Sequence, residues 1–159
     1  MGIIISGFKG CGRTYFTEVN NDKVKIFEKR GSLKNDDIDE IMNIINDYDI
    51  IFIDSSSKTR ELLENRNIDY DVFYPSKERR GEFLENQVKK HSPMNEIREL
   101  DSNFDKWIEE IDDDDSENCH KHKMNEKGLF IGNTQVIMEF MAFLKNNKKE
   151  NNVSDDTSR

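Results

Sequence analysis

A glycine-rich loop near the start of the chain constrains the fold more than any other feature of the sequence. The apolar residues 3–5 lead into it, and glycines at positions 7, 10 and 12 are followed by Arg13 and Thr14. Glycine permits backbone angles that other residues avoid, so successive N–H groups can curl around an anion. A helix that starts after the loop adds further unpaired N–H groups. The sequence therefore predicts a strand, a phosphate-binding loop and a helix over residues 3–19.

The spacing of this loop matches the P-loop pattern, except that Arg13 stands where the pattern has lysine. Thr14 can place its hydroxyl on a Mg²⁺ ion that also contacts the phosphates. Arginine is a planar fork and lysine a compact charge, so Arg13 is a candidate phosphate ligand and catalytic residue whose effect on turnover differs from that of lysine. An ordinary glycine-rich turn is the alternative. The expected phosphate-binding residues are Gly7, Lys9, Gly10, Cys11, Gly12, Arg13 and Thr14.

Composition limits the function classes. The 159 residues suit one domain, and the formal net charge of -9 gives no sign of the basic surface that nucleic-acid binding requires. No segment has the length and hydrophobicity of a membrane span, and we interpret the first apolar run as a strand, not a signal peptide. Because Cys11 lies in the loop, a structural disulfide with Cys119 is not expected. These observations favour a cytoplasmic protein that does not bind nucleic acid or membranes.

Strands and helices are predicted to alternate along the first half of the chain. Strands are expected at residues 24–27, 49–54 and 70–74, and helices at residues 36–46 and 55–65. This alternation predicts a three-layer α/β fold, with a parallel sheet of about five strands and helices on both faces. Ligands of such sheets bind at the carboxyl ends of the strands, where Gly7, Glu28, Asp54 and Pro75 are expected.

Asp54 has two interpretations. It directly follows a continuous apolar run that predicts a buried parallel strand. Its carboxylate can reach a Mg²⁺ ion directly or through water. It can equally cap the helix that follows. The sequence does not decide between a metal ligand and a helix cap.

Residues 76–111 are predicted to be helical, with a break at Ser92 and Pro93. The first half of this segment is basic, which indicates either a solvated helix face or a lid whose cations contact phosphates. Residues 104, 107, 108 and 111 follow helical spacing and predict a core face, so Trp107 is expected to be a core residue. The basic residues are Lys77, Arg79, Arg80, Lys89 and Lys90.

The last third of the chain is less informative. Residues 112–115 read as a solvated acidic loop. Cys119, His120 and His122 alternate with other residues in a way that favours a fifth strand, with a zinc site as the weaker alternative. A turn or short strand is expected at residues 128–132. An amphipathic helix is expected at residues 134–145, with a core face formed by Val136, Ile137, Phe140, Met141 and Leu144. One domain of residues 1–146 and a disordered polar tail of residues 147–159 are therefore predicted.

Four stretches together give the chain a resemblance to a known family. They are the loop, residues 48–63, residues 72–75 with the charged helix after them, and residues 103–108. In their order the chain resembles the P-loop nucleoside and deoxynucleoside monophosphate kinase-like proteins of bacteriophages and some bacteria, as a diverged member. The resemblance implies Mg²⁺ as cofactor, a helical lid at residues 76–111, and phosphoryl transfer from ATP to a nucleoside monophosphate in the cytoplasm, that of the host if the protein is phage-encoded.

The resemblance also implies roles for single residues. Arg60 and Glu28 are expected to contact the acceptor nucleotide, and Arg80 is expected to act as a catalytic cation of the lid. Arg13, Glu28 and Asn86 depart from the family pattern. These departures favour as an alternative a nucleotide-binding protein that sequesters or senses a nucleotide, in host nucleotide signalling if the protein is phage-encoded. A third hypothesis is an interaction protein that keeps only the fold.

Overall fold

The computed structural model describes residues 2–20, 22–29 and 31–157, with only the backbone of residues 148–157. Five parallel strands form one sheet in the order β2-β3-β1-β4-β5. The predicted α/β fold class and the fifth strand are thereby confirmed. The strands are β1 (Ile3–Gly7), β2 (Val24–Ile26), β3 (Ile50–Ile53), β4 (Tyr70–Pro75) and β5 (Cys119–Met124).

Burial explains why the central strands are continuous apolar runs. β1 lies between β3 and β4, with Ile5 opposite Phe52 on one side and Asp71 on the other. All four residues of β3 are buried, as expected for a parallel strand covered on both faces. β5 lies at the edge, and only its first and last residues, Cys119 and Met124, are buried.

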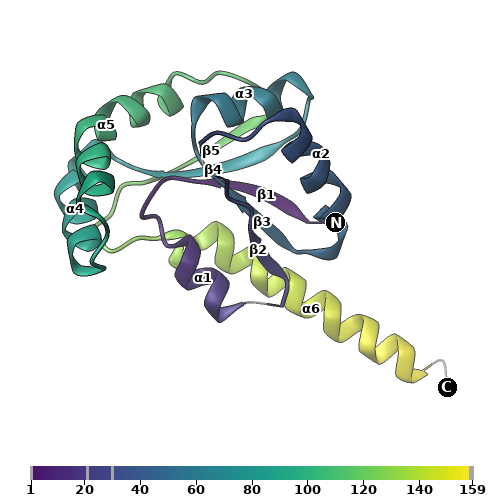
Figure 1. Cartoon of the computed structure of the whole chain (residues 1–159). Helices are drawn as coiled ribbons and strands as arrows, with labels where there is room; N and C mark the ends of the chain where they lie inside the picture. Colours follow the sequence, from purple (N-terminus) through teal and green to yellow (C-terminus); the bar gives the residue numbers. More distant parts are fainter. Residues whose placement is uncertain (1, 21, 30, 158–159) are drawn as a thin grey trace.

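Helices cover both faces of the sheet (Figure 1). α1 and α6 lie on one face and α2 and α3 on the other, while α4 and α5 stand beyond the carboxyl ends of the strands. The α-helices are α1 (Arg13–Val19), α2 (Asn35–Ile44), α3 (Ser57–Asn65), α4 (Arg80–Lys89), α5 (Met94–Asp112) and α6 (Gln135–Thr157). Short 3-10 helices are η1 (Ile45–Asp47), η2 (Lys77–Arg79) and η3 (Ile131–Asn133).

Aromatic packing holds the α4–α5 pair against the glycine-rich loop. Phe8, which follows β1, is fully buried and meets the ring of Phe104 edge-on at 5.3 Å between centroids. Phe83 of α4 lies 6.1 Å from Phe8 in a similar arrangement. Because aromatic pairs of this kind add specific geometry to apolar burial, they fix both helices relative to the loop.

The helical segment after β4 breaks where the sequence predicts. α4 ends at Lys89 and α5 begins at Met94, with His91 in a left-handed conformation (φ 57°) between them. The Ser92 hydroxyl donates to the Gln87 side-chain oxygen at 2.8 Å, which fixes the turn.

The C-terminal part follows the sequence-based expectation at one point and differs from it at two. Residues 128–132, expected to form a turn or a short strand, contain a turn at Gly128 and the start of η3, and no strand. Of the expected core face of α6, Ile137 is buried and Phe140 and Met141 pack against the core, whereas Val136 is exposed. Residues 147–157, expected to be a disordered tail, continue α6, as a run without glycine or proline permits, while residues 158 and 159 lie outside the described residues. None of the helices in the described part of the chain combines the length and hydrophobicity that crossing a bilayer requires.

Candidate functional site

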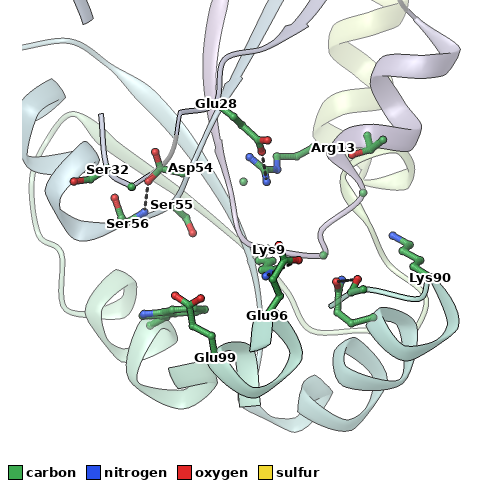
Figure 2. A pocket seen from close by; sticks show the side chains of 18 residues that line it. Lys9, Arg13, Glu28, Ser32, Asp54, Ser55, Ser56, Lys90, Glu96 and Glu99 are labelled. Atoms are coloured by element: carbon green, nitrogen blue, oxygen red, sulfur yellow. Dashed lines mark hydrogen bonds and ion pairs between the residues drawn. The ribbon is translucent and has the colours of Figure 1, made fainter. Parts of the chain in front are cut away.

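The carboxyl ends of β1, β2 and β3 open into a cavity of about 750 Å³ (Figure 2). The chain leaves β1 toward α1 and leaves β3 toward α3, which lie on opposite faces of the sheet. Such a reversal creates the crevice in which parallel α/β sheets bind ligands. Helices α4 and α5 form the wall opposite the sheet. We call this space the main cavity, and it is lined by Gly7, Lys9, Gly10, Gly12, Arg13, Thr14, Glu28, Gly31, Ser32, Asp54, Ser55, Ser56, Gln87, Lys90, Ser92, Glu96, Glu99 and Trp107.

The backbone of the 7–14 loop presents hydrogen-bond donors to the main cavity. Gly10 and Gly12 adopt φ angles of 90° and 98°, which only glycine accepts without strain. The Cys11 N–H donates to the Phe8 carbonyl at 3.0 Å. Within the described residues, no protein acceptor pairs with the N–H groups of Gly10, Gly12 or Thr14. Unpaired N–H groups ahead of a helix form an anion-binding concavity.

Arg13 is held across this loop. Its stem passes so close to Gly7 that a Cβ at Gly7 would lie 2.6 Å from the Arg13 Cδ. The guanidinium pairs with Glu28, at 2.7 Å between Nη2 and Oε1, and Nη1 donates to the Ile53 carbonyl at 3.4 Å. The structure therefore brings together Arg13 and Glu28, which the sequence assigned to different substrates. Arg13, which stands at the lysine position of the P-loop pattern, therefore already has a carboxylate partner in the main cavity.

Two lysines add positive charge beside the loop. Lys9 lies 3.5 Å from Glu96 of α5, in a loose ion pair. Lys90, just after α4, lines the main cavity and has no ion-pair partner among the described residues. Of the five lid cations proposed from the sequence, Lys90 alone lines the cavity among the described residues.

Cys11 contributes through packing. Its side chain is fully buried, and burial raises the pKa of its thiol to about 11. A thiol with such a pKa is protonated at neutral pH and is a poor nucleophile. The Cys11 backbone N–H donates to Phe8 and its carbonyl accepts from the Ile131 N–H at 3.0 Å, so the structure does not support the phosphate-binding role predicted for Cys11.

Asp54 anchors the start of the helix that follows β3, which agrees with one of its two interpretations, and its role as a metal ligand stays a prediction. Its Oδ1 accepts from the Ser56 N–H at 2.9 Å and its Oδ2 from the Thr59 hydroxyl at 2.9 Å, so the carboxylate anchors the start of α3. It also lines the main cavity together with Thr14. Each carboxylate oxygen has a second acceptor site, so the residue can also receive a water of a hydrated Mg²⁺ ion. The residues fit a Mg²⁺ ion held by Thr14 directly and by Asp54 through water.

A second cavity of about 570 Å³ lies on the other side of the loop. It has an apolar lining from Phe16, Val19 and Phe130, with the exposed ring of Tyr15 beside them. Side-chain amides also line it, those of Asn20, Asn86 and Asn133. We call this space the apolar cavity. It shares Gly10, Gly12 and Lys90 with the main cavity, so the loop forms part of both walls.

Arg60 and Arg80 line neither cavity. Arg60 is almost fully buried, forms an ion pair with Asp114, and donates from Nε to the Ser55 carbonyl at 3.3 Å. Arg80 pairs with Asp101 of α5 at the exposed surface. The structure therefore does not support the acceptor-binding and lid roles that the resemblance implied for these arginines, because nearby carboxylates hold both away from the cavity.

The ligand atoms of Glu64, Asp114 and Cys119 lie within 4.8 Å of one another. This set already has protein partners: Asp114 pairs with Arg60, and Glu64 accepts from the Tyr70 hydroxyl at 2.8 Å. Burial raises the pKa of the Glu64 carboxyl and that of the Cys119 thiol. We interpret the group as a structural polar cluster.

The histidines of β5 pair with a neighbouring strand. The His122 Nε2 lies 2.8 Å from the Asp71 carboxylate, and its ring stacks on Phe73. His120 lies 3.9 Å from Asp69. Neither histidine joins Cys119 in a metal-ligand group among the described residues, so the strand interpretation of this segment is the one that the structure supports.

Sequence reasoning missed the α5 side of the site. Trp107, interpreted as core, packs against the core at Phe8 but is only half-buried, and it also lines the main cavity with Glu96 and Glu99. These residues lie beside the buried stripe of Leu100 and Phe104 on the same helix. Their helical spacing places these residues on the face of α5 next to its buried stripe. Which part of the protein this face contacts depends on where α5 packs, and the sequence pattern does not give that position.

The comparisons with known proteins add no family. No protein-family model matches this chain, and no curated protein shows significant sequence similarity to it. The resemblance to monophosphate kinases therefore stays a prediction, and the function must be argued from the two cavities and the loop between them.

Proposed function

We propose that the protein binds a nucleoside triphosphate with Mg²⁺ and acts as a phosphotransferase of the P-loop kinase class. The observation that carries this proposal is the 7–14 loop, whose Gly10 and Gly12 line both a polar and an apolar cavity. An inorganic anion would use only the main cavity, which is the polar one of the two. A ligand with a flat apolar ring at one end and several phosphates at the other would use both.

Each part of such a nucleotide has a matching surface. The ring would enter the apolar cavity between Phe130 and α1, where the amides of Asn86 and Asn133 offer hydrogen bonds. The phosphates would meet the unpaired N–H groups of the loop and the ammonium of Lys90. Bound Mg²⁺ neutralises charge that develops on the phosphates, and Thr14 and Asp54 are the residues that would hold it.

Transfer in this proposal depends on position and charge. In this proposal a second substrate would occupy the remainder of the main cavity, beyond the loop and next to the terminal phosphate. Holding both substrates in line lowers the barrier without a covalent intermediate on the protein. Arg13 would stabilise the transferred group once its guanidinium leaves Glu28. The nucleoside monophosphate that the resemblance implies is one candidate acceptor.

A second candidate function has its own supporting observation. A kinase needs a cation at the terminal phosphate, and the Arg13 guanidinium is already engaged by the Glu28 carboxylate. A protein with this pair intact would bind a nucleotide without transferring phosphate, and would act by sequestering or sensing it.

A combined stability and transfer assay separates these functions. ATP with Mg²⁺ is expected to raise the melting temperature, since a ligand at a hundred times its Kd stabilises the folded state by about 2.7 kcal/mol. ADP formed only when an acceptor is present would support the kinase. A rise in melting temperature without ADP, which Arg13→Lys converts into turnover, would support the binding protein. No effect of any nucleotide on melting or turnover would contradict both.

A further inference from the structure

The main cavity is electrostatically divided. Its cations, Lys9, Arg13 and Lys90, belong to the loop or lie just after α4. Figure 2 shows the half of the cavity away from Arg13 and Lys90, where Ser32, Ser55 and Ser56 lie around Asp54 and where Glu99 projects from α5, while Glu96 lies at its border beside Lys9. We call this the acceptor half, because a second substrate facing the terminal phosphate must lie there.

The acceptor half offers hydroxyls and carboxylates. The Glu99 carboxylate has no ion-pair partner among the described residues, and Glu96 reaches only Lys9, at 3.5 Å. Apart from Lys9, which faces Glu96, no described cation lies in this half, since Arg60 is paired with Asp114 and Lys29 with Asp37. A phosphate monoester would meet carboxylates in this half, and like charges that lie close together disfavour binding.

We infer that the second substrate carries no phosphate of its own and is a neutral or cationic compound with hydroxyl or amino groups. This inference rests on the proposed function and narrows it, since it excludes the nucleoside monophosphates as preferred acceptors. Carboxylates and serine hydroxyls accept hydrogen bonds from hydroxyl and amino groups. Trp107 adds the face of an indole, which suits a flat ring or a cation.

The transfer step is then the phosphorylation of a hydroxyl group. The acceptor oxygen attacks the terminal phosphorus of the triphosphate, and the bond from that phosphorus to the bridging oxygen breaks. The hydroxyl proton passes to solvent. The products are a phosphate monoester and the nucleoside diphosphate, and the new monoester leaves because the acceptor half binds it less well than the free alcohol.

The test uses matched pairs of ligands that differ only in a phosphate. Adenosine, guanosine, cytidine and thymidine are each compared with their 5′-monophosphates, by calorimetry on the full chain saturated with a non-hydrolysable ATP analogue and Mg²⁺. At least one nucleoside is expected to bind about tenfold or more tightly than its monophosphate. Monophosphates that bind as well as or better than all four nucleosides, or no binding of any nucleoside, would overturn the inference.

Two charge-reversal variants locate the effect. Glu99→Lys places a cation in the acceptor half and is expected to shift the ratio of nucleoside to monophosphate affinity by about tenfold toward the monophosphate. Asp105→Lys makes the same charge change on the exposed side of α5 and is expected to leave the ratio unchanged. Arg30→Gln is measured in parallel because Arg30 lies outside the described residues. A monophosphate preference that Arg30→Gln removes, or equal shifts in the two charge-reversal variants, would contradict the inference.

Binding of the ATP analogue is measured first. Its absence would refute the proposed function itself, whereas analogue binding with a monophosphate preference would refute only the inference about the acceptor.

Discussion

The main cavity and the structural polar cluster differ in how their charges are satisfied. In the cluster, near the amino ends of β4 and β5, Arg60 pairs with Asp114 and the Tyr70 hydroxyl with Glu64. At the carboxyl ends of the strands, the N–H groups of Gly10 and Gly12 and the ammonium of Lys90 have no protein partner among the described residues. Both regions are rich in polar groups, but only the main cavity leaves them available to a ligand.

The comparison shows why arginines alone do not define a site. A buried charge must be paired, so an arginine inside the protein is held by the nearest carboxylate, as Arg60 is. Arg13 is also paired, but Glu28 is half exposed and the pair faces the cavity, where an anion can compete for the guanidinium. The same residue type therefore stabilises the fold in one region and lines a cavity in the other.

The largest expected effect comes from the polar cluster. Arg60→Met leaves Asp114 without its cation in a largely buried position, and it is expected to lower the free energy of unfolding by about 3–5 kcal/mol. Urea unfolding measures the loss, and ATP affinity below the transition should be unchanged. Arg80→Met removes an exposed pair with Asp101 and should cost at most about 1 kcal/mol. Weaker nucleotide binding by Arg60→Met at unchanged stability would place the cluster in the functional site.

The second effect concerns the backbone of the loop. Gly12→Ala puts a Cβ on a residue with φ of 98° and 3.3 Å from the Cβ of Phe130, so the loop must shift. ATP affinity is expected to fall about tenfold or more, as measured by calorimetry.

Gly128→Ala is the matched control for the loop. Gly128 has a φ of 81°, and a Cβ there would meet open space. A left-handed alanine costs about 1–2 kcal/mol at either position, but only the loop variant should lose affinity. Equal affinities of the two variants would mean that the loop does not bind the nucleotide.

A smaller effect is expected at the Arg13–Glu28 pair. Glu28→Gln removes the charge that competes with phosphate for the guanidinium, and ATP affinity should rise by up to about fivefold, because an exposed pair is worth at most about 1 kcal/mol. Glu61→Gln changes the net charge equally on an exposed face of α3 and serves as the control. A fall in affinity with Glu28→Gln would show that Glu28 assists binding.

The smallest effect is a pH dependence of stability. Burial raises the pKa of Glu64 above its ordinary value of 4.5, so the folded state holds this proton more tightly than the unfolded state. Stability contributed by protonated Glu64 is therefore lost as pH rises from 4.5 through the folded pKa. Glu64→Gln should flatten this decrease, measured by urea unfolding between pH 4.5 and neutrality. The same slope in Glu64→Gln and wild type would show that another group causes it.

Much of the fold follows from local pattern. The buried strands β1 and β3 are runs of Ile and Phe, and the loop between β1 and α1 is marked by its glycines. These signals depend on residues close together in the sequence, so the sheet class and the loop could be predicted. The pairing of Arg60 with Asp114 joins residues 54 positions apart, and no local pattern indicates it.

The site could be predicted only in part for the same reason. The position of the loop and of Asp54 beside the main cavity could be predicted from the sequence, because both follow the carboxyl ends of strands. Glu96, Glu99 and Trp107 enter the main cavity because Phe8 and Phe104 dock α5 beside the loop. That packing is a tertiary effect, and it decides the charge of the acceptor half.

The central claim is that the 7–14 loop binds a nucleotide, and calorimetric titration of the full chain with ATP and Mg²⁺ tests it most directly. We predict saturable binding of one ATP per chain, which Gly12→Ala weakens and Gly128→Ala does not. No binding of ATP by the folded wild-type protein, or binding that both variants retain in full, would contradict the account.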